Sequence, residues 1–304
     1  MSKKVFIIGN GFDLDLGMNT RFSDFAKSNE WPFKNPTMGL AFHLRNQAKI
    51  DKWFDLEQEL LEYAVKSTRR FLENDKQSFN NLTEKLTLYI RSEEKKPFLV
   101  NSVAAQVLKA VIDNGYFDSI YSFNYTNLYS IAEKIGIDKS FKYEHVHGSI
   151  KENSIILGVE ENTDLKQGYE YMYKTFSPHY ESHSIQYDML EADEVVFFGH
   201  SLGHNDYHYF KAFFQFQCRD GMTRKDGKRI TIFTYDNKSA IEILKQLRRM
   251  NEKKTNLLFN LNNMQIICTI ESSSKRLTSF LKRMCEEGVE ADARRLDSFE
   301  MNNQ

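Results

Sequence analysis

The chain has 304 residues, and its 41 Lys and Arg against 42 Asp and Glu give a net charge of −1. This balance provides no overall attraction to nucleic acid or to anionic membranes, so we expect neither as a partner. Hydrophobic residues make up 41% and aromatic residues 13% of the chain, a composition that excludes a disordered protein.

The apolar runs and the cysteines indicate a cytoplasmic protein. No run approaches the roughly 18 apolar residues of a membrane span, and residues 5–8 are too short for the core of a signal peptide. Cys218, Cys268 and Cys285 are odd in number and lack the spacing of a disulfide framework or a zinc ribbon. Unpaired thiols of this kind are usual in a reducing compartment.

In chain order, short apolar runs alternate with stretches of helical periodicity. The runs predict buried strands at residues 5–8, 119–123, 194–198, 229–233 and 264–268. The helical stretches are residues 98–113, 127–136, 205–219, 237–250 and 273–286. The alternation predicts an α/β fold: a doubly wound, mostly parallel, Rossmann-like sheet with helices on both faces and right-handed crossovers.

Residues 40–96 interrupt this alternation with two amphipathic helical patterns and no strand between them. We therefore predict a Rossmann-like nucleotide-binding domain formed by residues 1–39 and 97–285, a helical insertion at 40–96, and a polar tail at 286–304. The insertion follows the first strand closely, so we expect it near the ligand site. Its many apolar residues should cover the sheet edge or a partner subunit, and plain packing of its helices against the core is the alternative.

Polar residues and glycines gather just after the predicted strands. Ligands of open parallel sheets bind outside the carboxyl ends of the strands, so this joint placement predicts the functional site. The residues concerned are Gly9, Gly11, Gly148, Gly199, Gly203, His145, His147, His200 and His204.

The turn after the first strand, residues 9–11 (Gly-Asn-Gly), lets the backbone approach a phosphate. The third glycine of the dinucleotide fingerprint would fall at Leu14, so the motif alone is weak support for a nucleotide site. Asp13 suits a metal ion or a helix cap, and for Asp15 we expect capping or solvation.

Two later strand ends carry groups for acid–base or metal chemistry. Asn124 can hold a hydroxyl or a water without titrating, and an Asx turn is the alternative. His145 and His147 share a face if the strand continues through them, and they suit either a general base or a pair of metal ligands. A zinc or manganese site would be completed by His200, His204 and Asp206.

Six sequence motifs follow one another along the chain. They are IIGNGFDLDLG (Ile7 to Gly17), WFDLEQEL (Trp53 to Leu60), SFNYTN (Ser122 to Asn127), HVHGS (His145 to Ser149), LGVE (Leu157 to Glu160) and FFGHSLGHND (Phe197 to Asp206). This ordered set resembles the AbiH family of bacterial abortive-infection proteins. The resemblance extends to about Asn237 and implies a role against phage.

The order of Gly-x-Gly, a strand ending in Asn, His-Gly and Gly-x-Ser-Leu is also similar, more distantly, to the sirtuin-like NAD-binding fold of defence NAD hydrolases. This resemblance implies that His147 is the general base on a ribose hydroxyl and that Asn124 contacts the nicotinamide ribose and the attacking water. The residues that it implies for binding NAD are Gly9, Asn10, Gly11, Asp13, Gly199, Ser201, Asp206, Asp236 and Asn237. Sirtuins carry Asp two residues after the Asn, where this chain has Thr126.

The resemblances lead to one expected function and two alternatives. We expect an enzyme that hydrolyses NAD, as its substrate, to nicotinamide and ADP-ribose without a metal ion. One alternative is a metal-dependent nuclease or phosphohydrolase using His145, His147, His200 and His204. The other is a module that senses a nucleotide without cleaving it. The expected function is compatible with a homo-oligomer and with activation by a phage-derived trigger.

Overall fold

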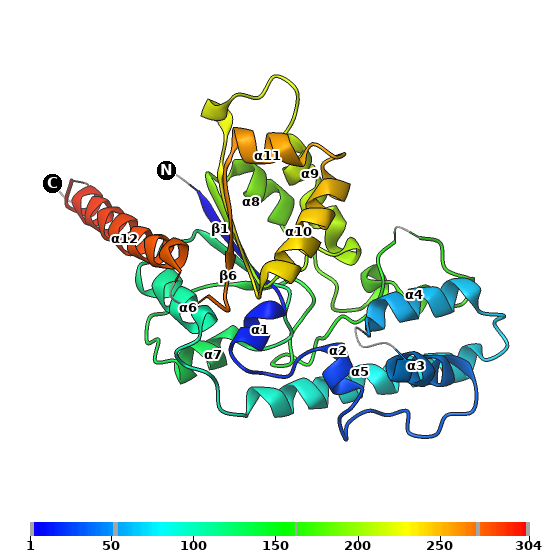
Figure 1. Cartoon of the computed structure of the whole chain (residues 1–304). Helices are drawn as coiled ribbons and strands as arrows, with labels where there is room; N and C mark the ends of the chain where they lie inside the picture. The colour runs from blue at the N-terminus through cyan, green and yellow to red at the C-terminus, as the bar shows by residue number, and fades with distance from the viewer. Residues whose placement is uncertain (1–2, 51–53, 162, 272–273, 302–304) are drawn as a thin grey trace.

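The computed structural model describes residues 3–50, 54–161, 163–271 and 274–301, so Trp53 and the last residues of the predicted tail lie outside the described residues. Six strands of this part of the chain form one sheet (Figure 1). They are β1 (Lys4–Ile8), β2 (Ser119–Ser122), β3 (Glu144–His145), β4 (Glu194–Phe198), β5 (Arg229–Thr234) and β6 (Asn263–Cys268).

All neighbouring strands pair in parallel, in the order β3-β2-β1-β4-β5-β6. The connections run one way from β1 to β3 and the other way from β4 to β6, which is the doubly wound arrangement. The predicted fold class is therefore confirmed, and the switch point lies between β1 and β4. The five predicted strands did not include β3, which has only two residues.

Helices cover both faces of the sheet because alternate residues of each strand point to opposite sides. In β1, Phe6 and Ile8 belong to one apolar core, and Val5 and Ile7 belong to the other. The first core is covered by α1 (Gly11–Asp15), α6 (Val103–Asp113), α7 (Leu128–Lys134) and α12 (Lys275–Met301). The second is covered by α8 (Ile185–Glu191), α9 (Tyr207–Phe216), α10 (Asn237–Met250) and α11 (Thr255–Leu261).

The remaining helices form a separate module beyond the carboxyl ends of the strands (Figure 1). They are α2 (Phe22–Phe25), α3 (Gly39–Ile50), α4 (Leu56–Lys66) and α5 (Leu72–Glu94). This module has its own apolar core, which also includes Trp31 before the predicted insertion and Ile150 and Leu157 after it. The insertion therefore packs as one unit with neighbouring segments of the chain.

The sequence of α4 explains its position. Asp55 caps the helix by accepting a hydrogen bond from the amide of Gln58, at 3.1 Å. Leu56, Leu60 and Ala64 recur every four residues and are fully buried in the core of the module. Because the first turn of α4 is fixed in this way, its polar residues have defined positions.

The predicted polar tail is helical in the structure, where α12 continues to Met301. Near the start of the tail, the Glu287 carboxylate accepts a hydrogen bond from the Tyr116 hydroxyl at 2.7 Å and one from Arg229 at 2.9 Å. These contacts hold the middle of α12 to the domain. No helix in the described part of the chain is long and apolar enough to cross a membrane.

Candidate functional site

The loops after β1 and β4 touch at the switch point of the sheet. The amide of Gly9 donates to the Phe198 carbonyl at 2.9 Å, and the amide of Gly11 donates to the Gly199 carbonyl at 2.8 Å. A Cβ atom on Gly9 would lie 2.5 Å from the His200 Cα atom. Close packing of backbone against backbone therefore requires glycine here, and both amides already have acceptors. A role of these glycines in binding NAD stays a prediction.

A buried carboxyl group lies between this switch point and the end of β2. The Asp13 carboxyl accepts hydrogen bonds from the Asn124 amide nitrogen at 2.8 Å and from the Thr126 hydroxyl at 3.0 Å. Burial raises the pKa of Asp13 to about 7, and the hydrogen bonds from Asn124 and Thr126 offset only part of this effect. Thr126 and Asn124 thus hold the Asp13 carboxyl group at the end of β2.

The oxygen atom of the Asn124 amide differs from its nitrogen atom in lacking a hydrogen bond. Its oxygen, Oδ1, is buried and has no hydrogen-bond partner among the described residues. Buried polar atoms are nearly always hydrogen-bonded, to protein or to an ordered water or ligand. The orphaned oxygen therefore marks a place for a water molecule or a polar ligand group at the end of β2.

A second cluster is centred on Asp206, in the short turn that precedes α9. His147 Nε2 lies 3.0 Å from Asp206 Oδ1, and His200 Nε2 lies 3.4 Å from Asp206 Oδ2. Both imidazole rings pack edge-on against the ring of Phe123, with centroids 5.3 Å and 4.5 Å away. The structure thus brings together three predicted residues from the ends of β3 and β4.

The electrostatics of this cluster keep His147 neutral. Burial and the nearby Lys174 ammonium lower the pKa of His147 to about 4, against the opposing effect of Asp206. The pKa of Asp206 is well below its usual range because hydrogen bonds from His147 and His200 and the charge of Lys174 outweigh the cost of burial. A neutral ring that donates from Nε2 to a carboxylate leaves Nδ1 as a proton acceptor.

Three charged residues of the cluster were missed by sequence reasoning. The Lys174 side chain is 2% exposed, and its Nζ lies 3.2 Å from Glu57 Oε2, 3.3 Å from Glu160 Oε1 and 3.5 Å from His147 Nε2. Asn205 Nδ2 donates to the same Glu57 oxygen at 3.2 Å. Glu57 belongs to α4 of the helical module, so that module contributes a side chain to the site.

A signal for two of these residues was present in the sequence. Glu57 lies in WFDLEQEL and Glu160 ends LGVE, and neither motif had been given a chemical role. Lys174 lies in a 3₁₀ turn (Lys174–Phe176) that follows no periodic pattern. In the ion cluster, burial raises the pKa of Glu57 to about 7, and the charge of Lys174 only partly opposes this rise.

Two of the predicted metal ligands lie outside the cluster. His145 Nδ1 is 3.0 Å from the Asn124 carbonyl oxygen, and its Nε2 is 3.0 Å from the Tyr143 hydroxyl. The His204 ring packs against Tyr207. Among the described residues, no group of three or more His, Cys, Asp or Glu side chains is arranged to hold a metal ion. Instead, the Lys174 ammonium provides the positive charge next to Asp206.

The remaining predicted NAD contacts have other partners in the structure. Asn10 Oδ1 accepts a hydrogen bond from the Thr20 hydroxyl at 2.6 Å. Asp236 caps α10 by accepting from the Ser239 amide at 2.8 Å. Ser201 is exposed, and Asn237 Oδ1 lies 3.7 Å from Cys268 Sγ. Asp15 accepts a hydrogen bond from the Ala104 amide at 2.7 Å, in the first turn of α6, whose N-cap is Ser102.

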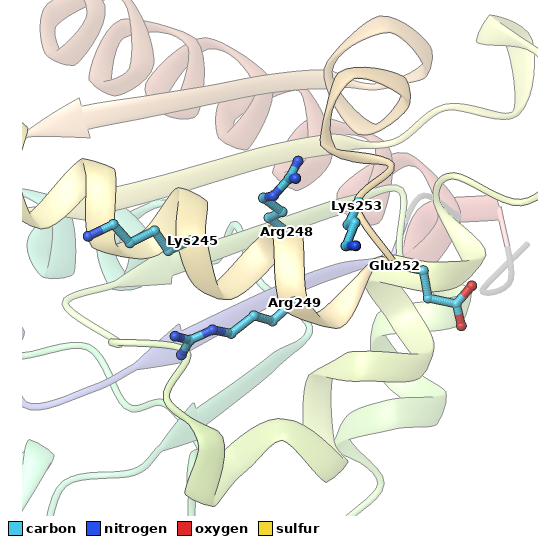
Figure 2. Close-up of a pocket in the computed structure, with 5 residues that line it drawn as sticks. All are labelled: Lys245, Arg248, Arg249, Glu252 and Lys253. Carbon is cyan, nitrogen blue, oxygen red and sulfur yellow. The ribbon is translucent and has the colours of Figure 1, made fainter.

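A surface hollow of about 520 Å³ lies beside the end of α10 (Figure 2). It is lined by Lys245, Arg248, Arg249, Glu252 and Lys253. Since α10 begins after the carboxyl end of β5 and runs back along the sheet, its last turns are remote from the strand ends. The candidate residues themselves are buried, with 1% of Asp13, 5% of Asn124 and 7% of His147 exposed.

Comparisons with known proteins give one family and a group of solved structures. A family model described as bacteriophage abortive infection AbiH matches residues 5–223. A search of curated proteins found no match.

A structure of Sir2 with the inhibitor EX-527, 2′-O-acetyl-ADP-ribose and a deacetylated p53 peptide is 11% identical to this chain, with a TM-score of 0.38, and the match covers 94% of each chain. A Sir2 variant with a deacetylated p53 peptide and 3′-O-acetyl ADP ribose is 11% identical, with a TM-score of 0.37, and covers 83% of this chain and 93% of its own.

Proposed function

Because the chain belongs to the AbiH family of bacteriophage abortive infection proteins, we propose that it serves phage defence as an enzyme that hydrolyses the nicotinamide–ribose bond of NAD. The products are nicotinamide and ADP-ribose. The observation that supports this activity best is the His147–Asp206 pair together with the orphaned oxygen of Asn124, at the ends of two neighbouring strands.

His147 acts as the general base in this reaction. Departure of nicotinamide builds positive charge on the ribose, and a ribose hydroxyl stabilises that charge better when its proton is partly removed. Asp206 accepts the Nε2 proton of His147 and so directs Nδ1 toward the ribose hydroxyl as the acceptor. General-base assistance of this kind typically contributes about 10²–10⁴-fold to a rate.

Asn124 positions the attacking water. Its amide nitrogen is fixed by Asp13, so its oxygen is held in one orientation and can accept a hydrogen bond from a water molecule. The bond from the ribose C1′ atom to the nicotinamide nitrogen breaks as the water oxygen bonds to C1′. Nicotinamide leaves as a neutral base, and one proton of the water passes to solvent.

The direct test is to incubate the purified protein separately with NAD, ATP, RNA and DNA and to determine the masses of the products. We expect nicotinamide and ADP-ribose from NAD and unchanged ATP, RNA and DNA. Turnover should persist in EDTA, because no step above uses a metal ion. Cleavage of a nucleic acid, or NAD turnover abolished by EDTA and restored by zinc or manganese, would contradict the proposal.

A further inference from the structure

The Lys174 ammonium is held by carboxylates from three separate parts of the chain. Glu57 comes from α4 of the helical module, Glu160 follows the Leu157–Val159 segment, and Asp206 belongs to the turn before α9, with its Oδ1 4.0 Å from Nζ. The pKa of Lys174 is raised because these carboxylates outweigh the cost of burial. The ammonium therefore stays charged inside the site.

The segment that carries this lysine has little regular structure. We call residues 173–184 the Lys174 segment; it contains one 3₁₀ turn and no strand or α-helix. Lys174 is its only buried residue, whereas Phe176 is 59% and Tyr180 is 37% exposed. Outside the ion cluster, hydrogen bonds hold the segment: the Tyr173 hydroxyl donates to the Thr163 carbonyl at 3.0 Å, and His183 Nδ1 lies 2.9 Å from Glu144 Oε2. Lys174 is therefore the member of the segment whose side chain reaches the buried site, and moving it means withdrawing its ammonium from the ion cluster.

The cluster offers three carboxyl groups to the single ammonium of Lys174. Glu57, Glu160 and Asp206 face a single ammonium, and His147 beside them is neutral. Glu57 is partly protonated at neutral pH because burial raises its pKa to about 7, but a buried Asp206 carboxylate without a cation beside it is costly. The site therefore favours any cation that can enter and replace the ammonium. In the proposed reaction, that cation is the pyridinium ring of NAD.

We propose that Lys174 is an autoinhibitory latch, whose ammonium occupies the carboxylate cluster beside His147 until a cationic part of the ligand replaces it. The assignment of that ligand group rests on the proposed NAD hydrolysis. The latch itself rests on the 3.5 Å approach of Lys174 Nζ to His147 Nε2 and on the burial of both side chains.

The latch keeps His147 a weak base. The charged groups and the histidine that act on its ring are Lys174, Asp206 and His200, and the rings of Phe123 and Tyr209 also pack against it. Of these groups, Lys174 and His200 oppose a positive charge on His147, and Asp206 favours it. When Lys174 leaves, the pKa of His147 rises toward neutrality, where a general base is most effective.

The test is Lys174→Met, with two measurements on the folded protein. The first is an NMR titration of the His147 ring, assigned by its absence in His147→Gln. We expect the pKa of His147 to rise by about one pH unit or more, because a neighbouring charge shifts a pKa by that amount. The second is nicotinamide release from NAD at pH 7, which should rise several-fold.

Two further variants keep this test informative. Lys166→Met removes an exposed lysine from the same loop region and should change neither measurement. If Lys174→Met does not fold because its carboxylates lack a counter-ion, Lys174→Met combined with Glu57→Gln removes the ammonium together with one of its carboxyl partners. This double variant should show the same rise in the pKa of His147.

The outcomes separate the latch from the proposed function. An unchanged pKa of His147 in a folded variant overturns the latch. A raised pKa with diminished NAD turnover also overturns it, because Lys174 would then be required for the reaction. If neither wild type nor variant cleaves NAD, the proposed function fails, and a raised pKa still supports Lys174 as the group that restrains His147.

Discussion

At the scale of single residues, Asp13 links the stability of the protein to pH. Its pKa is about 7 in the folded protein, against an ordinary value of 3.8. The folded state therefore binds the proton more tightly than the unfolded state, and the stability that this proton contributes is lost as the pH rises from about 4 to about 7. The largest slope for one such group is about 1.4 kcal/mol per pH unit.

Asp13→Asn should remove this pH dependence. The asparagine oxygen can still accept from Asn124, and its nitrogen can donate to Thr126, so the contacts are retained without a charge. We expect the free energy of unfolding of the variant, relative to wild type, to increase between pH 4 and pH 7 and to level off above pH 7. Urea unfolding at several pH values measures it, and a difference independent of pH would contradict the assigned pKa.

At the scale of elements, the turn after β1 and the loop after β4 depend on glycine for their close approach. Gly199 has a φ of +66°, and a Cβ atom there would lie 2.3 Å from the Phe12 amide nitrogen. Gly221 has a φ of +79° with no atom within 4 Å of such a Cβ. Both glycines have a left-handed backbone conformation. Only at Gly199 would a Cβ atom collide with the neighbouring loop.

We therefore expect Gly221→Ala to cost about 1–2 kcal/mol, the usual strain of a left-handed residue. Gly199→Ala should cost more, because the methyl group also pushes the β1 turn from the β4 loop. Chemical denaturation of both variants gives the comparison. Equal losses of stability would show that the close approach of the two loops contributes nothing.

The helical module is expected to restrain the site, since an enzyme that consumes NAD would otherwise deplete its host. Leu60 is fully buried in the core of the module, one turn after Glu57 on the same helix. Leu60→Ala should cost about 2–5 kcal/mol. Because the substitution loosens α4, it should weaken the contact between Glu57 and Lys174 and so raise basal NAD turnover.

The matched control is Leu82→Ala, which empties a fully buried position of the same core on α5. It should lose comparable stability with a smaller rise in turnover, because α5 contributes no side chain to the ion cluster. Equal rises in the two variants would indicate a general loosening of the module, and an unchanged rate in Leu60→Ala would make the module purely structural.

At the scale of the whole molecule, the sequence predicted the sheet because its strands are buried on both faces and read as continuous apolar runs. Because the carboxyl ends of parallel strands share one edge, it predicted a cluster of His145, His147, His200, His204 and Asp206, of which His147, His200 and Asp206 come together. It could not predict that His145 would lie outside this cluster, because that depends on where the two-residue strand β3 ends.

The ion cluster shows why the remainder of the site was missed. Glu57 lies in a helix remote in sequence from the strands, and Lys174 is buried by tertiary packing that no local pattern encodes. A buried lysine is rare without partners, so its sequence position alone indicates exposure. Only the folded chain reveals that three distant carboxylates surround it.

The central claim is that His147 acts on NAD, and the most direct measurement is the rate of nicotinamide release by His147→Ala relative to wild type. His179→Ala, which removes an exposed histidine, is the control. With folded proteins at equal concentration, we expect a fall of about 10²–10⁴-fold for His147→Ala and no change for His179→Ala. Undiminished nicotinamide release by His147→Ala would contradict the account.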